Sequence, residues 1–230
     1  MIIATYNVQH VNNYKSQVID FDACANAIKS MNADVVGLNE IRGAGNDPDY
    51  TNQVERLASM LGMHCVFGMS AYIGNKGPYG NALLSKYPVM KSEVIPIPTP
   101  NGKEPRSVLR AQLSNGLVIL QTHLGLTPDE HKTGVDIIHS LLVKEEKPCM
   151  LMGDFNVTPD NSVLSPLYND ERVVSTDGML KGALTFPSID PDRKIDYIFA
   201  NRLVEFDSVF VPDITESDHR PIVATVNNLQ

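Results

Sequence analysis

The sequence predicts a single α/β domain, residues 1–230, built on extensive β-sheet. Apolar runs bounded by turn residues recur along the chain and indicate many strands, whereas only three segments space their apolar residues as a helix does. No linker rich in Gly, Ser or Pro divides the chain, and it contains no internal repeat or low-complexity tract. Because hydrophobic residues occupy 43% of the 230 positions, a sizeable core is expected.

The first elements are predicted from the spacing of apolar residues. Residues 2–8 are rich in β-branched and aromatic side chains, which predicts a strand. Residues 21–31 place apolar side chains three or four positions apart, which predicts an amphipathic helix, and residues 34–38 then form a buried strand. The same helical spacing predicts two further helices, at residues 52–61 and 129–144.

The remaining strands are predicted from short apolar, β-branched runs. Between the second and third helices these are residues 64–67, 81–85, 91–97, 107–113 and 117–123. The last third of the chain adds residues 149–152, 172–175, 195–200, 205–211 and 222–226. The irregular polar stretches are predicted to be loops, which usually carry the substrate contacts of such folds; they are residues 43–50, 71–79, 99–106 and 176–194.

The charge balance restricts the kind of ligand. Lys and Arg total 19 against 27 Asp and Glu, which gives a net charge of −8. Non-specific binding to duplex nucleic acid depends on Lys and Arg side chains that neutralise phosphates. The sequence therefore argues against a protein whose main role is to grip a duplex backbone.

We also expect a soluble, cytoplasmic protein, and a monomer. No window approaches the roughly 18 uninterrupted apolar residues of a membrane span. The first residues, MIIATYNV, have the pattern of a strand and lack the basic and apolar regions of a signal peptide. Cys24, Cys65 and Cys149 are far apart and outside any C-x-x-C pattern, so reduced core thiols are expected.

Several predicted strands end in an abrupt polar exit. A polar side chain just beyond a buried strand is held on a rigid element and still reaches solvent, which suits a preorganised site. The residues in these exits are Asn7, Glu40, His123, Asp154, Asn156, Asp218 and His219.

The residue types in these exits fit one kind of chemistry. Glu40, Asp154 and Asp218 offer carboxylate oxygens, and Asn7 and Asn156 offer amide oxygens. Such a set suits Mg²⁺ or Mn²⁺ better than Zn²⁺, which prefers several His or Cys ligands. A metal of that kind stabilises charge on a phosphoryl oxygen, and a histidine can deprotonate an attacking water.

Each piece also has an ordinary structural explanation. The tetrapeptide G-D-F-N, residues 153–156, is by itself more often a turn. Glu40 alone could be a solvated strand end, and His123 could be a hydrogen-bonded core histidine. Asp196 is harder to explain this way, because a carboxylate within K-I-D-Y-I-F must be paired if it is buried.

The joint order of the motifs resembles the endonuclease/exonuclease/phosphatase superfamily, the deoxyribonuclease-I-like phosphohydrolases. The group includes pancreatic deoxyribonuclease, abasic-site endonucleases, neutral sphingomyelinases, inositol-polyphosphate phosphatases and deadenylases. G-D-x-N followed by S-D-H-x-P, with Glu40 upstream, is the most specific part. The matching strings run from Asn7 to Pro221 and are Y-N-V, L-N-E-I-R, G-N-A-L-L-S-K-Y-P, T-H-L, G-D-F-N, K-I-D-Y-I-F and S-D-H-R-P.

The resemblance implies a fold and a metal site. The fold is a four-layer sandwich, in which two packed mixed β-sheets are flanked by helices and the site lies at one edge. Glu40 is implied as the main ligand of Mg²⁺ or Mn²⁺, with Asn7 and Asp218 close to the metal.

The resemblance also implies catalytic roles for the remaining residues. His219 is implied as the general base or the electrostatic partner of the phosphate, oriented by Asp196. Asp154 would position or activate the water, and Asn156 would hydrogen-bond the phosphoryl oxygens. His123 would contact the phosphate or assist the leaving group, and water would attack in line without a covalent intermediate.

Two departures limit the resemblance. Asn39 precedes Glu40, where many family nucleases have Gln, so the contact made by that residue is open. The chain has no tryptophan and no evident long basic loop or apolar hairpin. The features of an abasic-site reader or of a membrane-docked sphingomyelinase are therefore missing.

Candidates for substrate binding are less specific. Arg42 resembles a deoxyribonuclease arginine that approaches the substrate, but it could equally be a surface arginine. The other candidates could each be an ordinary solvated charge, although an aromatic beside a cation can stack on a base or sugar. They are Lys76, Tyr79, Arg106, Lys181 and Lys194.

Three functions remain open on the sequence. The first is a metal-dependent phosphodiesterase acting on a nucleic acid or nucleotide-like phosphoester. The second is a hydrolase of a small phosphorylated sugar or lipid headgroup, and the third is a binding module without turnover. Adjacent residues of an extended chain point to opposite sides, so we expect Asp218 on the metal side and His219 beside Asp196.

Overall fold

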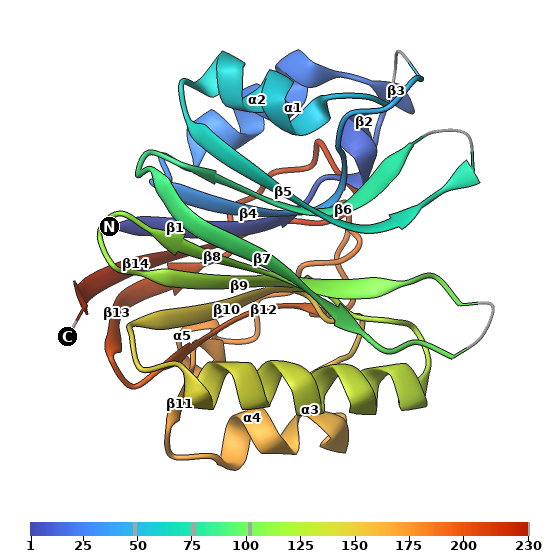
Figure 1. Ribbon diagram of the computed structural model, residues 1–230. Helices are drawn as coiled ribbons and strands as arrows, with labels where there is room; N and C mark the ends of the chain where they lie inside the picture. Colours follow the sequence, from blue (N-terminus) through green and yellow to red (C-terminus); the bar gives the residue numbers. More distant parts are fainter. Residues whose placement is uncertain (48–49, 75–76, 101–102, 230) are drawn as a thin grey trace.

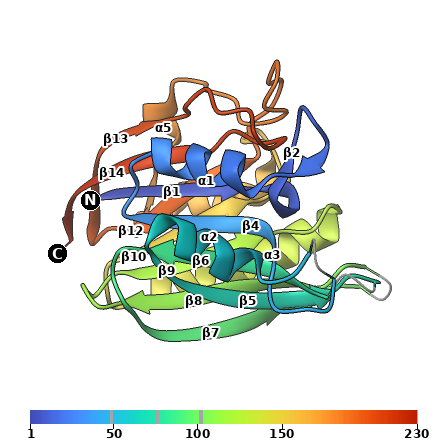
Figure 2. The same ribbon diagram turned by 90° about the horizontal axis from the view of Figure 1, so that it is seen from above.

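Two six-stranded sheets pack face to face, and helices cover the outer face of each (Figure 1). The computed structural model describes residues 1–47, 50–74, 77–100 and 103–229. The predicted four-layer sandwich of two mixed sheets flanked by helices is confirmed. Viewed along the other axis, the strands of both sheets run in roughly the same direction, as expected for aligned sheet packing (Figure 2).

The first sheet has a parallel pair at its centre. Strands β1 and β4 are parallel, and the other neighbours in the order β13-β14-β1-β4-β6-β5 are antiparallel. The strands are β1 (Ile2–Asn7), β4 (Val35–Arg42), β5 (His64–Tyr72), β6 (Pro78–Ser85), β13 (Val204–Phe210) and β14 (Ile222–Leu229).

The second sheet repeats this plan. Strands β9 and β10 are the parallel pair in the order β11-β12-β10-β9-β8-β7. The strands are β7 (Val89–Ile97), β8 (Arg106–Leu113), β9 (Val118–His123), β10 (Cys149–Asp154), β11 (Val173–Ser175) and β12 (Asp196–Asn201). A small separate sheet pairs β2 (Asn12–Asn13) with β3 (Val18–Ile19).

Side chains cap the N-termini of α1 and α3. The side chain of Asp20 accepts a hydrogen bond from the amide of Ala23 at the start of α1, and Thr127 and Glu130 form a capping box on α3. Among the described residues no helix is both long and apolar enough to cross a membrane. The helices are η1 (Gln9–Val11), α1 (Phe21–Ser30), α2 (Gln53–Leu61), α3 (Pro128–Lys144), η3 (Ser162–Leu164), α4 (Ser165–Asn169) and α5 (Asp177–Leu180).

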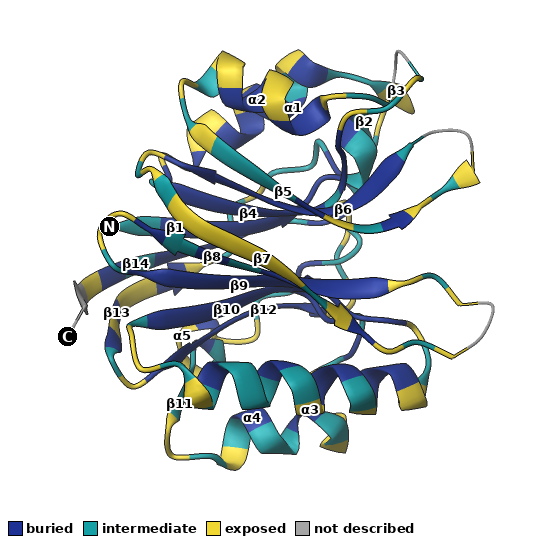
Figure 3. Cartoon of the chain, in the orientation of Figure 1, coloured by how far each residue is buried: buried dark blue, intermediate teal, exposed yellow. Residues whose placement is uncertain are grey.

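Three apolar layers hold the sandwich together. One lies between the first sheet and α1 and α2, and includes Leu38 and Leu57. The second lies between the two sheets, and the third lies between the second sheet and α3 and α4. The central strands are accordingly buried throughout, whereas the edge strand β7 is largely exposed (Figure 3).

Some predicted boundaries are wrong because cross-strand pairing extends the strands. β5 and β6 continue into the predicted loop 71–79, where Ala71 pairs with Tyr79. β4 runs on to Arg42, past the predicted end at residue 38, and the predicted loop 176–194 contains the short helix α5. Long-range pairing decides these ends, and local composition does not report it.

The topology places one end of every central strand at the same edge. Asn7 is paired with Asn39 at the ends of the parallel strands β1 and β4, and Asp154 is paired with His123 at the ends of β9 and β10. Strand β12 is antiparallel to β10 and therefore begins at this edge. Carboxyl ends of parallel strands are the usual place for ligands in α/β sheets.

Gly153 allows the close approach of β10 to β9. Its φ is 141°, and a Cβ atom there would lie 1.9 Å from the backbone oxygen of Thr122. We predict that Gly153→Ala lowers the free energy of unfolding by roughly 2–5 kcal/mol, because overpacking and backbone strain add. Chemical denaturation measures this, with Gly178→Ala as the control, since a Cβ at Gly178 meets nothing within 4 Å. Equal stability of the two variants would contradict the prediction.

Candidate active site

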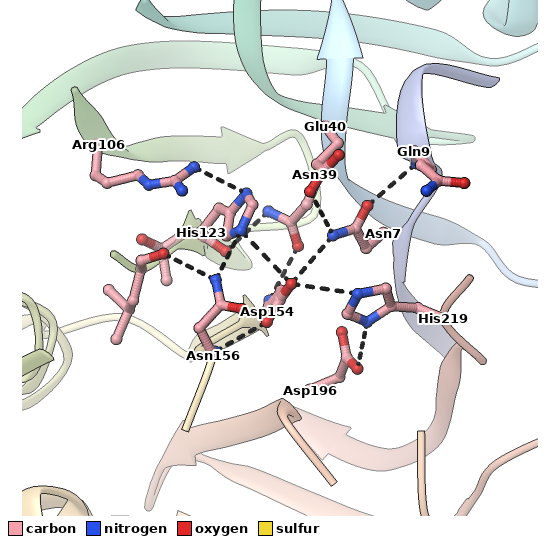
Figure 4. Close-up of polar contacts among 12 residues, drawn as sticks. Asn7, Gln9, Asn39, Glu40, Arg106, His123, Asp154, Asn156, Asp196 and His219 are labelled. Atoms are coloured by element: carbon pink, nitrogen blue, oxygen red, sulfur yellow. Dashed lines mark hydrogen bonds and ion pairs between the residues drawn. The ribbon is translucent and has the colours of Figure 1, made fainter. Parts of the chain in front are cut away.

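Asp154 lies at the centre of a cluster of polar side chains at this edge (Figure 4). Its Oδ2 accepts a hydrogen bond of 3.1 Å from Asn7 Nδ2. The same oxygen lies 3.5 Å from His123 Nε2 and 3.6 Å from His219 Nε2. The carboxylate therefore joins a side chain of the first sheet to two histidines.

Burial changes the protonation of Asp154. Only 1% of the residue is exposed, and desolvation raises its pKa to about 7. The charge of His219 opposes this rise, and that of Asp196 adds to it. A carboxyl group with such a pKa can exchange a proton near neutral pH.

His219 and Asp196 form a buried pair, as expected from the sequence. Nδ1 of His219 donates to Asp196 Oδ2 at 2.9 Å, and both residues are less than 5% exposed. Burial alone lowers the pKa of His219, but the carboxylates of Asp196 and Asp154 outweigh it and raise the pKa to about 10. His219 is therefore an imidazolium at neutral pH, with its Nε2–H directed toward Asp154.

His123 is the neutral member of the pair of histidines. Burial and the neighbouring Arg106 guanidinium hold its pKa well below the usual value. Nη1 of Arg106 lies 3.2 Å from Nδ1. Because a guanidinium only donates, Nδ1 accepts, and Nε2 faces Asp154.

Asn156 is held in place by its backbone as well as its side chain. Its φ of 55° is left-handed, and its amide N–H donates to Asp154 Oδ1 at 2.9 Å. Its side-chain Nδ2 donates to the carbonyl of Leu124 at 3.1 Å and lies 2.9 Å from His123 Nε2. The turn that G-D-F-N forms is thus part of the cluster.

Glu40 sits at an irregularity of β4. The register of β4 against β6 shifts between Leu38 and Ile41, and the φ of Glu40 is 57°. Such a bulge redirects a side chain out of the pleat. Oε1 of Glu40 accepts from Asn7 Nδ2 at 3.2 Å, and burial followed by the charge of Asp218 raises the pKa of its carboxyl group.

The surroundings of Glu40 and Asp218 fit a divalent cation. The pKa of Asp218 is also raised, first by burial, so a cation would relieve two carboxyl groups at once. Gln9 Nε2 donates to Asp218 Oδ2 at 3.1 Å, and Oε1 of Gln9 is buried without a hydrogen-bond partner among the described residues. Oxygen donors of this kind suit Mg²⁺ or Mn²⁺.

A second set of possible ligands fits a metal less well. Asp154, Asp196 and His219 offer atoms within 4.8 Å of one another. His219 is protonated, however, and its Nδ1 is already bound to Asp196, so its ring has no lone pair to offer. These three side chains instead form a chain in which His219 is hydrogen-bonded to Asp196 and ion-paired with Asp154.

Asn39 is the residue before Glu40 whose contacts the sequence did not predict. It is fully buried and uses its whole hydrogen-bonding capacity. Nδ2 donates to Asn81 Oδ1 at 2.7 Å and to the carbonyl of Thr122 at 2.8 Å. Oδ1 accepts from Gln121 Nε2 and from the backbone amide of Asp154, both at 3.0 Å. One amide therefore ties the strand that carries Glu40 to the strand that carries Asp154.

The candidates for substrate binding lie behind the cluster. Arg42, Tyr79 and Arg106 are 2%, 4% and 8% exposed, and Lys194 is buried against Asp177 at 2.8 Å. Arg106 instead supports His123, so direct substrate contact by these side chains stays a prediction. Lys76 lies outside the described residues, and Lys181 is exposed at the end of α5.

The site also includes residues that the sequence did not indicate. A cavity of about 490 Å³ is lined by five of the predicted site residues together with His131, Phe186 and Arg193; the five are Glu40, Asp154, Asn156, Asp218 and His219. The ring of Phe186 lies 4.8 Å from that of His219. Gln9 and His10 reach Asp218 and Glu40 from η1. No periodicity marks these positions, because distant loops bring them to the edge.

Comparisons with known proteins agree with this fold. The chain is 26% identical over 222 residues to Uncharacterized protein YbhP of Escherichia coli strain K12, which covers 87% of this chain and 86% of that protein. A solved endonuclease/exonuclease/phosphatase from Beutenbergia cavernae superposes with a TM-score of 0.81 at 24% identity, covering 99% of this chain and 71% of that one. A mannosyl-6-phosphatase from Bacteroides thetaiotaomicron superposes with a TM-score of 0.80 at 14% identity, covering 99% of both chains.

The match to a family is more direct. The sequence model of the Endonuclease/Exonuclease/phosphatase family matches residues 4–219. This stretch includes Asn7, Glu40, Asp154, Asp196 and His219. The chain therefore belongs to the endonuclease/exonuclease/phosphatase family.

Proposed function

We propose that this protein is a divalent-metal-dependent hydrolase of phosphoester bonds. The observation that carries the proposal is one cavity in which an imidazolium, a carboxyl group with a pKa of about 7 and a pair of further carboxyl groups meet. These groups are His219, Asp154, Glu40 and Asp218. Members of the family act on phosphoesters, and the site contains the groups that such chemistry requires.

Glu40, Asp218 and Asn7 would hold Mg²⁺ or Mn²⁺. The ion would supply positive charge to a phosphoryl oxygen and to the developing charge of the leaving group. His219, as an imidazolium, would donate its Nε2–H to another phosphoryl oxygen, and Asp196 would keep the ring in that orientation. This favours the electrostatic role of His219 over that of general base.

Asp154 is then the better base. As a carboxylate it would orient a water molecule and accept its proton, and a pKa near 7 matches this task. Asn156 would donate to a phosphoryl oxygen through its amide. His123, neutral and fixed by Arg106, would contact the phosphate or assist the leaving group.

The charges around the cavity favour a small phosphorylated molecule over a polynucleotide. Arg106 is paired with Glu104, Lys132 with Asp136, and Arg193 with Asp192. Paired cations do not form the track that a nucleic-acid backbone needs. The neighbouring cavity of about 530 Å³ shares His131 and Asn161 with the catalytic one and offers room for an organic group.

The comparisons support this preference only at the level of the fold. The Bacteroides thetaiotaomicron neighbour is a mannosyl-6-phosphatase, but at 14% identity its likeness shows the fold alone. A nuclease or nucleotide phosphodiesterase therefore remains the second candidate. A panel of phosphorylated sugars, lipid headgroups, nucleotides, single-stranded DNA and RNA distinguishes them, and preferred cleavage of the polymers would overturn our preference.

We predict that Glu40→Gln lowers metal-dependent hydrolysis of bis(p-nitrophenyl) phosphate by about 100-fold or more, because the variant loses a charged ligand. Release of p-nitrophenol in Mg²⁺ or Mn²⁺ measures this, and EDTA should abolish the wild-type rate. Glu205→Gln, at an exposed position of β13, is the matched control and should keep the full rate. Equal rates in all three proteins would exclude the proposed site.

We predict that the imidazole of His219 titrates near pH 10 in the metal-free protein. The negative charges of Asp196 and Asp154 favour the protonated ring, so the ring loses its proton only as the pH rises well above neutral. In Asp196→Asn the titration should move down by about one unit or more. NMR titration of the imidazole resonance, assigned with His219→Asn, measures both values. A midpoint below pH 7 in the wild type would contradict the assignment.

A further inference from the structure

Three consecutive residues after β1 have left-handed backbones. The φ angles of Gln9, His10 and Val11 are 43°, 60° and 63°. Each costs a non-glycine residue roughly 1–2 kcal/mol relative to an ordinary conformation. Strain of this kind persists only where the surrounding structure enforces it, and it is concentrated at functional sites.

The surrounding contacts of this turn are extensive. The amide of Gln9 donates to Asn7 Oδ1 at 3.1 Å, and Gln53 Nε2 donates to the carbonyl of His10 at 2.8 Å. Val11 is only 2% exposed and packs in the core beneath α1 and α2. The result of this arrangement is that the ring of His10 faces β4.

The ring of His10 lies between Arg42 and Glu40. Nε of Arg42 donates to Nδ1 at 3.2 Å. Because arginine only donates, Nδ1 must accept, and a neutral ring then carries its proton on Nε2. That nitrogen lies 3.8 Å from Glu40 Oε2. The chain of contacts therefore directs an N–H group toward the carboxylate.

Arg42 is itself immobilised. Its guanidinium lies 5.4 Å from the ring centre of Tyr50 and 5.1 Å from that of Tyr79, and Nη1 lies 3.3 Å from the carbonyl of Gly77. The His10 ring packs against the same two tyrosines, with centroid distances of 6.0 and 5.3 Å. Such a buried, stacked arginine is suited to fixing a neighbour and not to meeting a substrate in solvent.

Each oxygen of Glu40 therefore has its own donor neighbour. Asn7 donates to Oε1, and Nε2 of His10 lies 3.8 Å from Oε2. Two such neighbours fix the plane of the carboxylate and leave its remaining lone pairs toward the cavity. Glu40 and His10 both have left-handed backbone conformations. The two strained segments therefore meet where these side chains approach each other.

We propose that His10 is a positioning residue that aligns Glu40 for metal binding and is itself held by Arg42. This inference rests on the proposed role of Glu40 as the main metal ligand. Partners of metal ligands typically contribute 10- to 100-fold to metal affinity. Arg42 would act through His10 and not on the substrate.

The experiment measures Mn²⁺ binding by isothermal titration calorimetry. His10→Phe keeps a ring between Tyr50 and Tyr79 but removes both nitrogens, and it should raise the Mn²⁺ dissociation constant by about 10- to 100-fold. His10→Gln restores an N–H donor and should bind Mn²⁺ within about threefold of the wild type. His64→Phe, at an exposed position of β5, is the matched control.

A second readout separates positioning from catalysis. Saturating Mn²⁺ should restore hydrolysis of bis(p-nitrophenyl) phosphate by His10→Phe to within about tenfold of the wild type, because a positioning residue does not touch the reacting atoms. Unchanged Mn²⁺ affinity in His10→Phe, or equal losses in His10→Phe and His10→Gln, would overturn the inference. Wild-type affinity in Glu40→Gln would instead overturn the proposed metal site.

Discussion

The hydrogen bonds of the Asn39 amide fix the two sheets relative to each other, and the geometry of the site depends on them. The amide lies between the sheets with both donors and both acceptor positions satisfied. Its chain neighbour is Glu40, and one of its partners is the backbone amide of Asp154. Loss of one partner would leave a buried polar group unsatisfied, at a cost of about 1–3 kcal/mol. The strand of Glu40, the proposed metal ligand, and the strand of Asp154, the proposed base, are thus tied together by one side chain.

Backbone strain is concentrated around the same contact. Glu40, Asn156 and the turn 9–11 all have positive φ, and Gly153 has a φ that other residues avoid. The apolar layers on both sides of each sheet provide the stability that holds these conformations. Because the strands beneath are buried and regular, the strained residues cannot relax without disturbing the strands. A rigid sandwich with irregular strand ends therefore gives preorganised side chains.

The sequence predicted the sandwich and the cluster of polar side chains at its edge because both correspond to local patterns in the sequence. Buried strands leave apolar runs, and polar residues at their ends stand out against them, which identified Asp154, Asp196 and His219. Charge alone does not report that Arg42 is buried beside two tyrosines, so the alternative of a surface arginine is wrong, whereas its contact with substrate stays a prediction. No sequence pattern indicated His10 or Gln9, because their contacts depend on left-handed dihedral angles and on partners more than 30 positions away. Side-chain partners and strand ends depend on residues that are far apart in the chain. The local pattern of a single sequence therefore does not reveal them.

The charges of the site bear on both the proposed chemistry and the proposed substrate. Glu40, Asp154 and Asp218 bring three carboxyl groups to one cavity, against the imidazolium of His219 and the guanidinium of Arg193, which is paired with Asp192. Such an excess of negative charge draws in a divalent cation and disfavours a polyanion, and the net charge of −8 acts in the same direction. In the proposed function, a phosphoester with one phosphate would be admitted because the cation would neutralise it locally. A polynucleotide would also bring phosphates that meet no free cation among the described residues of the cavity wall. The same charge that would hold the proposed metal would therefore also restrict the size of the anion that the site could accept.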